Sequence, residues 1–464
     1  GVEADANNVT VTGCRIVSSR TTFSGGDTPI AIWARAEYLN ATNNIIRGWR
    51  DVGNTTGYGF YCEDSPSGHF VFTGNTVETC YTGFSLTVAA LASQVTVANN
   101  EFRDLDQEGI ITVGSNNVSI TDNLLIDVGT ANAIYVAYGT DIEITGNTID
   151  GAATTDSGIT LTGTDGPATR TRRFVVSNNT IRAFTGRGIS VIDYVQNGVI
   201  SGNHIDGFIA AAPTDYSSIA CVVIEGLSSG NIPKYIEFTG NTLWRSKNGV
   251  MVYGVDVNNP ITNVSIQGNN IHHCAAGYNV GTVSCIAIDT FWVEDVSILN
   301  NDIDRMGRVI SNSDVESFPA AGPNVTPMGI RVRNGSRINI SQNNLSDIMR
   351  NGSGFATCIQ FENRDTGSTL GARSLTLSGN SITTSAGVAN PPHIGISVAS
   401  GQETSGTGAA TSIFNLNIED NTIRRMLFEG ILVFAAGGSV VQQVNISGNA
   451  VSQLTDATFG IGIW

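Results

Sequence analysis

A short phrase recurs along almost the whole chain: two apolar residues separated by one position, then Thr or Ser, any residue, Asn, any residue and an apolar residue. Residues 142–149 form a complete copy, and the Asn of that copy is Asn147. The Asn positions of the other copies are Asn44, Asn75, Asn100, Asn123, Asn179, Asn203, Asn241, Asn269, Asn301, Asn343, Asn380, Asn421 and Asn449. Asn100, Asn123 and Asn147 are 23 and 24 residues apart, and longer intervals fit the same unit with an inserted loop. A repeat of this length is typical of a solenoid.

Each repeat contains a second apolar pattern, in which Gly is followed by two aliphatic residues separated by one position, as in residues 158–161 and 188–191. Both patterns alternate with period two, which indicates short β-strands, and no segment has helical periodicity. We therefore predict an all-β fold, a single-stranded parallel β-helix of about fifteen coils. It should be right-handed, because crossovers between parallel strands strongly favour that hand.

The recurring Asn is expected to be structural. A corner between strands needs a residue that tolerates the left-handed backbone conformation and can hydrogen-bond locally, and Asn does both. Stacked Asn amides can also hydrogen-bond from one coil to the next. The Gly that often precedes the Asn suits the same sharp turn.

The repeat runs from Val9 to the last residue and predicts one β-helix domain over residues 1–464. Because the chain begins and ends inside a coil, we expect a fragment whose end caps lie in a longer protein. Three insertions stand out, at residues 302–328, 363–373 and 399–412. Long loops in a compact solenoid are more often functional than decorative.

The formal net charge of −16 argues against nucleic acid and against anionic membrane surfaces as partners. No apolar stretch is long enough to cross a bilayer, so we expect no membrane insertion. The seven Cys residues fall at core and turn positions of the repeat, and none of them fits a disulfide framework. No Cys and His spacing is typical of a zinc site, so no metal ligands are predicted.

Aligning the coils on the Gly-containing pattern brings one outward position of each coil into a column. In most coils this position holds an apolar residue or Thr, but in five successive coils it holds a charged residue or Tyr. Those five residues are Glu225, Tyr253, Asp289, Arg333 and Glu362, and the neighbouring outward column adds Met251, Arg331 and Gln360. Since the long insertions flank the same coils, the sequence predicts a groove with a floor of carboxylates, arginines and a tyrosine.

A long groove with acidic and aromatic groups suits an extended polysaccharide. Carboxylates two coils apart have backbones about 9.5 Å apart, and inverting glycosidases need about 6.5–9.5 Å between acid and base. We predict Asp289 and Glu362 as the catalytic pair, with Glu225 as the substitute member, and Arg333 as a substrate clamp. The alternative is an Asp–Arg–Glu salt-bridge ladder without function. The residues expected to bind substrate are Arg331, Arg333, Tyr253, Trp292 and Arg364.

On these repeats the chain resembles the pectate-lyase-like superfamily of right-handed parallel β-helix proteins, and it looks most like bacteriophage tailspike depolymerases. The resemblance covers nearly the whole chain but rests on the fold repeat, and the motifs of polygalacturonases and mannuronan epimerases are absent. It implies a homotrimer at an extracellular or virion surface that cleaves bacterial capsule or O-antigen polysaccharide. Tailspike acidic residues share no local motif, so no residue role is carried over.

Two other functions stay open. One is a polysaccharide lyase acting on uronic acids, for which Arg331 or Arg333 would serve as the base and Ca²⁺ is a possible cofactor. The other is a non-catalytic glycan-binding or adhesin shaft. Hydrolysis by a carboxylate pair needs no cofactor, and none is expected if the chain is a hydrolase.

Overall fold

The computed structural model describes most of the chain. The described residues are 1–4, 8–19, 28–35, 37–51, 56–63, 68–87, 93–151, 155–164, 166, 169–207, 220–275, 283–307, 309–310, 316–317, 325–349, 356–363, 372–386, 391–401, 412–436, 438–454 and 461–463. They divide into two compact units, Gly1–Ile209 (unit 1) and Ala210–Trp464 (unit 2). In these ranges we find no helix with the length and apolar character that a membrane crossing requires.

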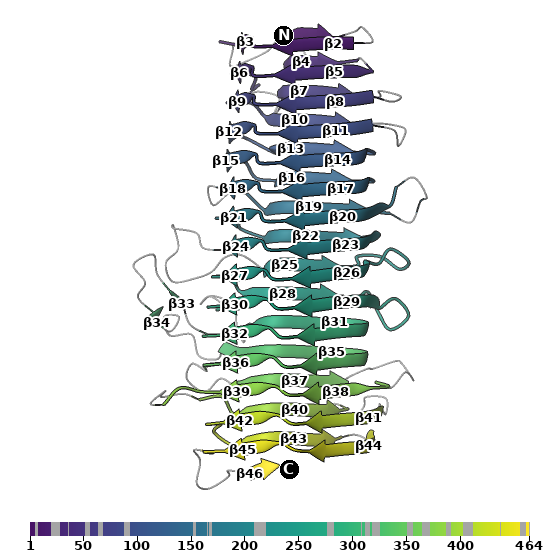
Figure 1. The fold of residues 1–464 in the computed structure, drawn as a ribbon, viewed down its shortest axis with the longest axis vertical. Helices are drawn as coiled ribbons and strands as arrows, with labels where there is room; N and C mark the ends of the chain where they lie inside the picture. The colour runs from purple at the N-terminus through teal and green to yellow at the C-terminus, as the bar shows by residue number, and fades with distance from the viewer. Residues whose placement is uncertain are drawn as a thin grey trace. The chain divides into compact units, whose positions relative to one another are not determined.

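Unit 1 is a stack of coils with three parallel strands each (Figure 1). The first strands of its coils are β1 (Val2–Ala4), β4 (Ile30–Ala34), β7 (Tyr58–Glu63), β10 (Thr82–Thr87), β13 (Ile110–Val113), β16 (Asn132–Ala137), β19 (Ser157–Gly163) and β22 (Arg187–Asp193). The second strands are β2 (Asn8–Thr12), β5 (Tyr38–Thr42), β8 (Gly68–Thr73), β11 (Ser93–Ala98), β14 (Asn116–Thr121), β17 (Thr140–Thr145), β20 (Thr171–Ser177) and β23 (Val195–Ser201). The third strands are β3 (Arg15–Val17), β6 (Ile45–Arg47), β9 (Thr76–Glu78), β12 (Glu101–Leu105), β15 (Leu124–Val128), β18 (Thr148–Asp150), β21 (Thr180–Arg182) and β24 (His204–Asp206).

Unit 2 repeats the same plan. Its first strands are β25 (Ala220–Glu225), β28 (Asn248–Tyr253), β37 (Thr357–Asn363), β40 (Ile394–Ser400), β43 (Glu429–Ala435) and β46 (Ile461–Ile463). Its second strands are β26 (Lys234–Thr239), β29 (Ile261–Gln267), β38 (Leu375–Ser378), β41 (Ser412–Glu419) and β44 (Val440–Ser447). Its third strands are β27 (Thr242–Trp244), β30 (Asn270–His272), β32 (Asp302–Asp304), β36 (Asn344–Ser346), β39 (Ser381–Thr383), β42 (Thr422–Arg424) and β45 (Ala450–Ser452). In two coils the first and second strands join into one 17-residue strand, β31 (Val283–Leu299) and β35 (Val325–Ser341).

The alternation read from the sequence places one side of every strand in a continuous apolar column. In β19, for example, Ile159 and Leu161 point inward and are fully buried. Like residues stack on like residues between coils: the rings of Phe60 and Phe84 lie 4.5 Å apart and nearly parallel. Burial of such side chains contributes about 1.5–3 kcal/mol each.

The Asn series forms a hydrogen-bonded ladder in each unit. Asn147 is fully buried, and both its backbone N–H and its side-chain Nδ2 donate to Oδ1 of Asn179 on the next coil, at 2.9 and 3.0 Å. Nδ2 also donates to the carbonyl of Ile120 at 2.8 Å. In return, Asn147 Oδ1 accepts two hydrogen bonds from Asn123. The amide therefore satisfies buried backbone groups that no sheet partner reaches, which confirms its structural role.

The left-handed residue at this corner is the one before the Asn. Asp122, Gly146 and Asn178 have φ values of 53°, 69° and 55°, whereas the Asn that follows each of them has negative φ. The expectation that Asn itself takes this conformation was therefore wrong, and the preceding Gly, Asn or Asp takes it instead. The two roles fall on neighbouring residues for a physical reason. The ladder needs the side-chain amide of Asn, whereas a positive φ needs a residue type that tolerates the left-handed conformation.

The predicted fold is confirmed: the chain forms a right-handed parallel β-helix. Among the described residues, unit 1 has eight third strands and unit 2 has seven, which agrees with about fifteen coils. None of the seven Cys residues, all of which lie in the described part of the chain, forms a disulfide. Of the long insertions, residues 308, 311–315, 318–324, 364–371 and 402–411 lie outside the described residues. The first insertion includes an antiparallel pair, β33 (Val309–Ile310) with β34 (Glu316–Ser317).

Candidate functional site

Two outward rows cross the first strands of unit 2. The first row, here called the Arg333 row, consists of Glu225, Tyr253, Phe291, Arg333, Glu362, Ala399 and Phe434. The second, here called the Asp289 row, consists of Val223, Met251, Asp289, Arg331, Gln360, Ser397 and Leu432. Each row places side chains from successive coils side by side, although their residues lie far apart in sequence.

The predicted column was wrong at one position. Asp289 pairs with Met251 and Arg331, so it lies in the neighbouring row, and Phe291 takes the place assigned to it. The cause is a two-residue slip: the alignment took Cys285 as the counterpart of the Gly, whereas Ala287 fills the slot of Gly249. A shift of two residues keeps the same side chains pointing inward, so the apolar alternation is satisfied equally by both registers.

Asp289 is the centre of a buried ion-pair cluster. Its side chain is 2% exposed, and Arg331 binds it with two hydrogen bonds, Nε to Oδ1 at 2.9 Å and Nη2 to Oδ2 at 2.8 Å. Arg333 Nη2 adds a third at 3.2 Å, and the Tyr253 hydroxyl donates to Oδ2 as well. Four hydrogen bonds therefore converge on this carboxylate, one on Oδ1 and three on Oδ2.

The titration behaviour of the neighbours agrees with this bonding. Burial raises the pKa of Tyr253, and the charge of Asp289 and the hydrogen bond to it raise that pKa further, so the phenol stays protonated as a donor. Burial opposes the charged form of Arg331, but the hydrogen bonds to Asp289 and its charge outweigh burial and raise the pKa of Arg331. Glu362 contributes to the same shift, which places its charge near Arg331.

Arg333 is held between aromatic rings. Its guanidinium carbon lies 4.7 Å from the ring centre of Phe291 and 5.7 Å from that of Tyr253, both within cation–π range. The two rings meet edge to face at 6.4 Å. Both hydrogen bonds of Arg333 come from Nη2, and its Nη1 makes none to any residue that the structure describes. A quarter of the side chain is exposed.

Glu362 lies at the start of a separate hollow. Its side chain is 4% exposed and accepts a hydrogen bond from Gln360 Nε2. The hollow has a volume of about 400 Å³, and the residues that line it include Glu362, Gln360, Ser397, Phe428, Glu429 and Phe434. Burial raises the pKa of Glu429. Two carboxylates in different environments therefore share one hollow, a combination that acid–base chemistry uses.

Asp289 and Glu362, the predicted catalytic pair, lie in neighbouring rows on strands two coils apart, and their role stays a prediction. Asp289 is enclosed by its own ion pairs, and Glu225 lies at the far end of the Arg333 row, four coils from Glu362. At about 4.8 Å per coil, that separation is about 19 Å, which is too long for an acid–base pair. The structure does bring together Tyr253, Arg331 and Arg333, three of the residues expected to bind substrate.

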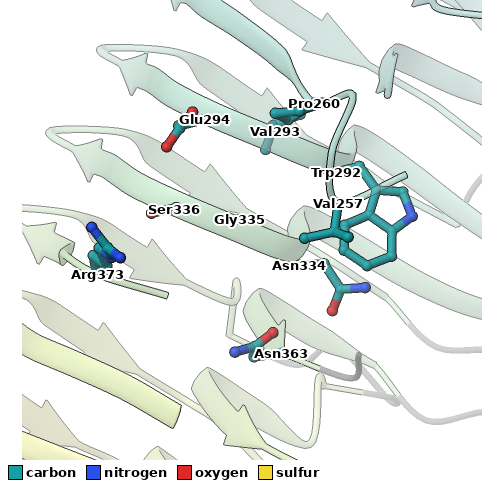
Figure 2. A pocket seen from close by; sticks show the side chains of 10 residues that line it. All are labelled: Val257, Pro260, Trp292, Val293, Glu294, Asn334, Gly335, Ser336, Asn363 and Arg373. Carbon is teal, nitrogen blue, oxygen red and sulfur yellow. The ribbon is translucent and has the colours of Figure 1, made fainter. Parts of the chain in front are cut away.

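The remaining predicted binding residues are placed as follows. Trp292 lies next to Phe291, with ring centres 5.2 Å apart, and borders a second hollow shown in Figure 2. Arg364 lies outside the described residues. Sequence reasoning left out Glu429 and Arg373. Glu429 directly precedes a repeat Gly and could have been found by that spacing, but no pattern in the sequence marks Arg373.

A family model described as "Periplasmic copper-binding protein (NosD)" matches residues 6–206, less than half of the chain. No protein among the curated ones matches the sequence. In the described part of the chain, no group of three or more His, Cys, Asp and Glu side chains is arranged to hold a metal ion.

Solved β-helix structures are similar in fold. The catalytic unit of a GH87 α-1,3-glucanase from Streptomyces thermodiastaticus is 14% identical, with a TM-score of 0.43 over 86% of this chain and 64% of that chain. The Pseudomonas phage phi297 tailspike gp61 is 14% identical, with a TM-score of 0.39 over 71% of this chain and 48% of that chain. The Streptococcus pneumoniae surface protein and adhesin PfbA is 11% identical, with a TM-score of 0.46 over 88% of this chain and 92% of that chain. This chain thus spans less than two thirds of the length of the glucanase catalytic unit and of the tailspike gp61.

Proposed function

We propose that unit 2 binds an extended polysaccharide along the Arg333 row and the Asp289 row. The observation that supports this most directly is the fixed orientation of Arg333, which is held by Asp289 and flanked by the rings of Tyr253 and Phe291. A guanidinium held in place loses little freedom when it donates to sugar hydroxyls, and aromatic rings cover the apolar face of a sugar. In this role Asp289 is a positioning residue.

The test is binding to a panel of purified bacterial capsular and O-antigen polysaccharides, measured by affinity electrophoresis. Arg333→Ala should weaken binding at least tenfold, because a hydrogen bond to a charged group contributes about 1.5–3 kcal/mol. Arg424→Ala removes an exposed arginine at the end of β42, outside both rows, and is the matched control. Equal binding by Arg333→Ala and wild type to every glycan that wild type recognises would refute the proposal.

Cleavage of the bound chain is the second candidate, and the shared hollow of Glu362 and Glu429 favours it. The raised pKa of Glu429 suits a general acid, and Glu362 is then the base of an inverting hydrolysis. New reducing ends without ultraviolet absorbance would support hydrolysis, and the absorbance of an unsaturated product would support a lyase instead. Glu362→Gln should abolish turnover while binding persists. If the wild-type protein binds polysaccharide but forms neither product, the result supports a non-catalytic glycan-binding shaft.

With bacterial surface polysaccharide as the ligand, the proposed site of action is outside the cell or on a virion surface. A homotrimer belongs to the same proposal. Light scattering of the purified protein measures the mass of the assembly directly, and a mass of one 48.7 kDa chain would refute the trimer.

A further inference from the structure

The hollow that Glu362 borders lies where both outward rows continue past β37. Its lining includes Gln360, Ser397 and Leu432 from the Asp289 row, and Glu362, Ala399 and Phe434 from the Arg333 row. Its volume of about 400 Å³ lies in the range of small-molecule binding sites, about 300–1,000 Å³. A polysaccharide bound along the two rows therefore places one of its residues in this hollow.

The charge balance of the hollow favours a cation. Its lining contains two acids, Glu362 and Glu429, and no basic residue. Glu362 is compensated, because it accepts a hydrogen bond from Gln360 and interacts with Arg331 on the neighbouring strand. Glu429 forms no ion pair with any residue that the structure describes, and burial raises its pKa. One carboxyl group in the hollow thus lacks a counter-charge.

Ser397 is a second polar group without a partner. It is 5% exposed, and its hydroxyl forms no hydrogen bond within the described part of the chain. It lies on β40, between the strand of Glu362 and the strand of Glu429. Buried polar groups in folded proteins are nearly always hydrogen-bonded. A buried hydroxyl in the lining of a hollow therefore marks a place for a polar atom of a ligand.

The apolar part of the lining decides between ligand types. Phe428 and Phe434 line the hollow together with the two acids. The faces of phenyl rings attract cations, and a carboxylate in apolar surroundings needs a cation as its partner. A protonated amine satisfies both requirements and brings three N–H donors for the carboxylate and the Ser397 hydroxyl. A neutral alcohol supplies no counter-charge, and Glu429 repels an anion.

We propose that this hollow binds an amino-sugar residue of the polysaccharide, with its ammonium group on the Glu429 carboxylate and on the hydroxyl of Ser397. The rings of Phe428 and Phe434 then cover the apolar face of that sugar. This inference rests on the proposed polysaccharide binding and adds the class of sugar that the site selects. It is an alternative to cleavage at this hollow, because a carboxylate paired with an ammonium group is no general acid.

Ligand-observed NMR titrations with methyl β-glucosaminide, methyl N-acetyl-β-glucosaminide and methyl β-glucoside test it, at about pH 6, where the free amine is protonated. Wild type should bind the glucosaminide about tenfold more tightly than either neutral sugar. Glu429→Gln should lose this preference, and it should remain folded because it removes a buried acid. Ser397→Ala should weaken binding of the glucosaminide about threefold. Glu237→Gln removes an exposed carboxylate on β26, outside both rows, and should change nothing.

Equal affinity for the glucosaminide and the glucoside, or an unchanged preference in Glu429→Gln, would overturn the inference. An equal loss in Glu237→Gln would overturn it too, since the effect would then come from the net charge of the chain. Failure of the proposed function looks different. If Arg333→Ala weakens polysaccharide binding while wild type binds the three sugars alike, only the amino-sugar site is wrong. If wild type prefers the glucosaminide but binds no polysaccharide, the hollow stands and the proposed function fails.

Discussion

Arg331 binds both carboxylate oxygens of Asp289, with Nε to Oδ1 at 2.9 Å and Nη2 to Oδ2 at 2.8 Å. The two residues are 42 positions apart in sequence but lie side by side on β31 and β35. Because the carboxylate is 2% exposed, its charge depends on these partners. The pair fixes the position of the Asp289 carboxylate between Arg331 and Arg333.

Replacing this carboxylate should be costly. Asp289→Asn leaves two partly buried guanidinium groups without their counter-charge, and breaking a buried ion pair costs about 3–5 kcal/mol. Since Arg331 and Arg333 remain partly exposed, we expect a loss of about 2–3 kcal/mol in the free energy of unfolding, measured by urea titration. Asp295→Asn breaks an exposed pair with Arg337 and should cost less than about 1 kcal/mol. Similar losses in the two variants would contradict the buried cluster.

The Asn ladder should respond strongly to truncation. Asn343 Nδ2 donates to the Ile298 carbonyl and to Asn380 Oδ1, and its Oδ1 accepts two hydrogen bonds from Asn301. Asn343→Ala leaves buried backbone groups unpaired at about 1–3 kcal/mol each, so we expect a loss of at least about 3 kcal/mol in urea unfolding. Asn344→Ala changes the next residue, which is exposed and bonded to Asp302, and should cost less than about 1 kcal/mol. A mild Asn343→Ala variant would show that the ladder is not needed for stability.

Glu429 should make stability depend on pH in a defined direction. Burial raises the pKa of this carboxyl in the folded state, so the folded protein holds its proton more tightly than the unfolded chain does. Its contribution is therefore most favourable below the unfolded pKa and is lost as the pH rises through the folded pKa. Glu429→Gln should gain thermal stability relative to wild type between pH 4 and pH 7. A constant difference in melting temperature across that range would argue against the shift.

The backbone at Trp292 predicts an inverted preference between Gly and Ala. A left-handed residue costs an L-amino acid about 1–2 kcal/mol that Gly does not incur. Trp292→Gly should therefore be more stable than Trp292→Ala by about 1 kcal/mol in urea unfolding. At the neighbouring Phe291, which lies in extended backbone, Phe291→Ala should be the more stable of the two, because Gly loses more entropy on folding. The same order at both positions would show that Trp292 is not held in the left-handed region.

The repeat made the coil predictable in detail. Alternating apolar residues identify the inward face of each strand, and the Asn with its preceding Gly, Asn or Asp identifies one corner. Both are local signals, because a side chain one residue out of step would point into solvent. The residues of the candidate site were harder to place. Tyr253, Arg331 and Arg333 were found, because their strands contain a clear repeat Gly at Gly249 and Gly329.

What the sequence determined by itself is the parallel β-helix, since period-two alternation and the Asn ladder allow few other folds. What only the tertiary structure decided is the register of β31 and the partners of its charged side chain. A slip of two residues leaves the same side chains pointing inward, so the pattern of buried residues fits both registers equally well. Only the contacts between coils distinguish the two registers. The pairing of Asp289 with Arg331, and the opening of a hollow between Trp292 and Arg373, therefore follow from packing across distant parts of the chain.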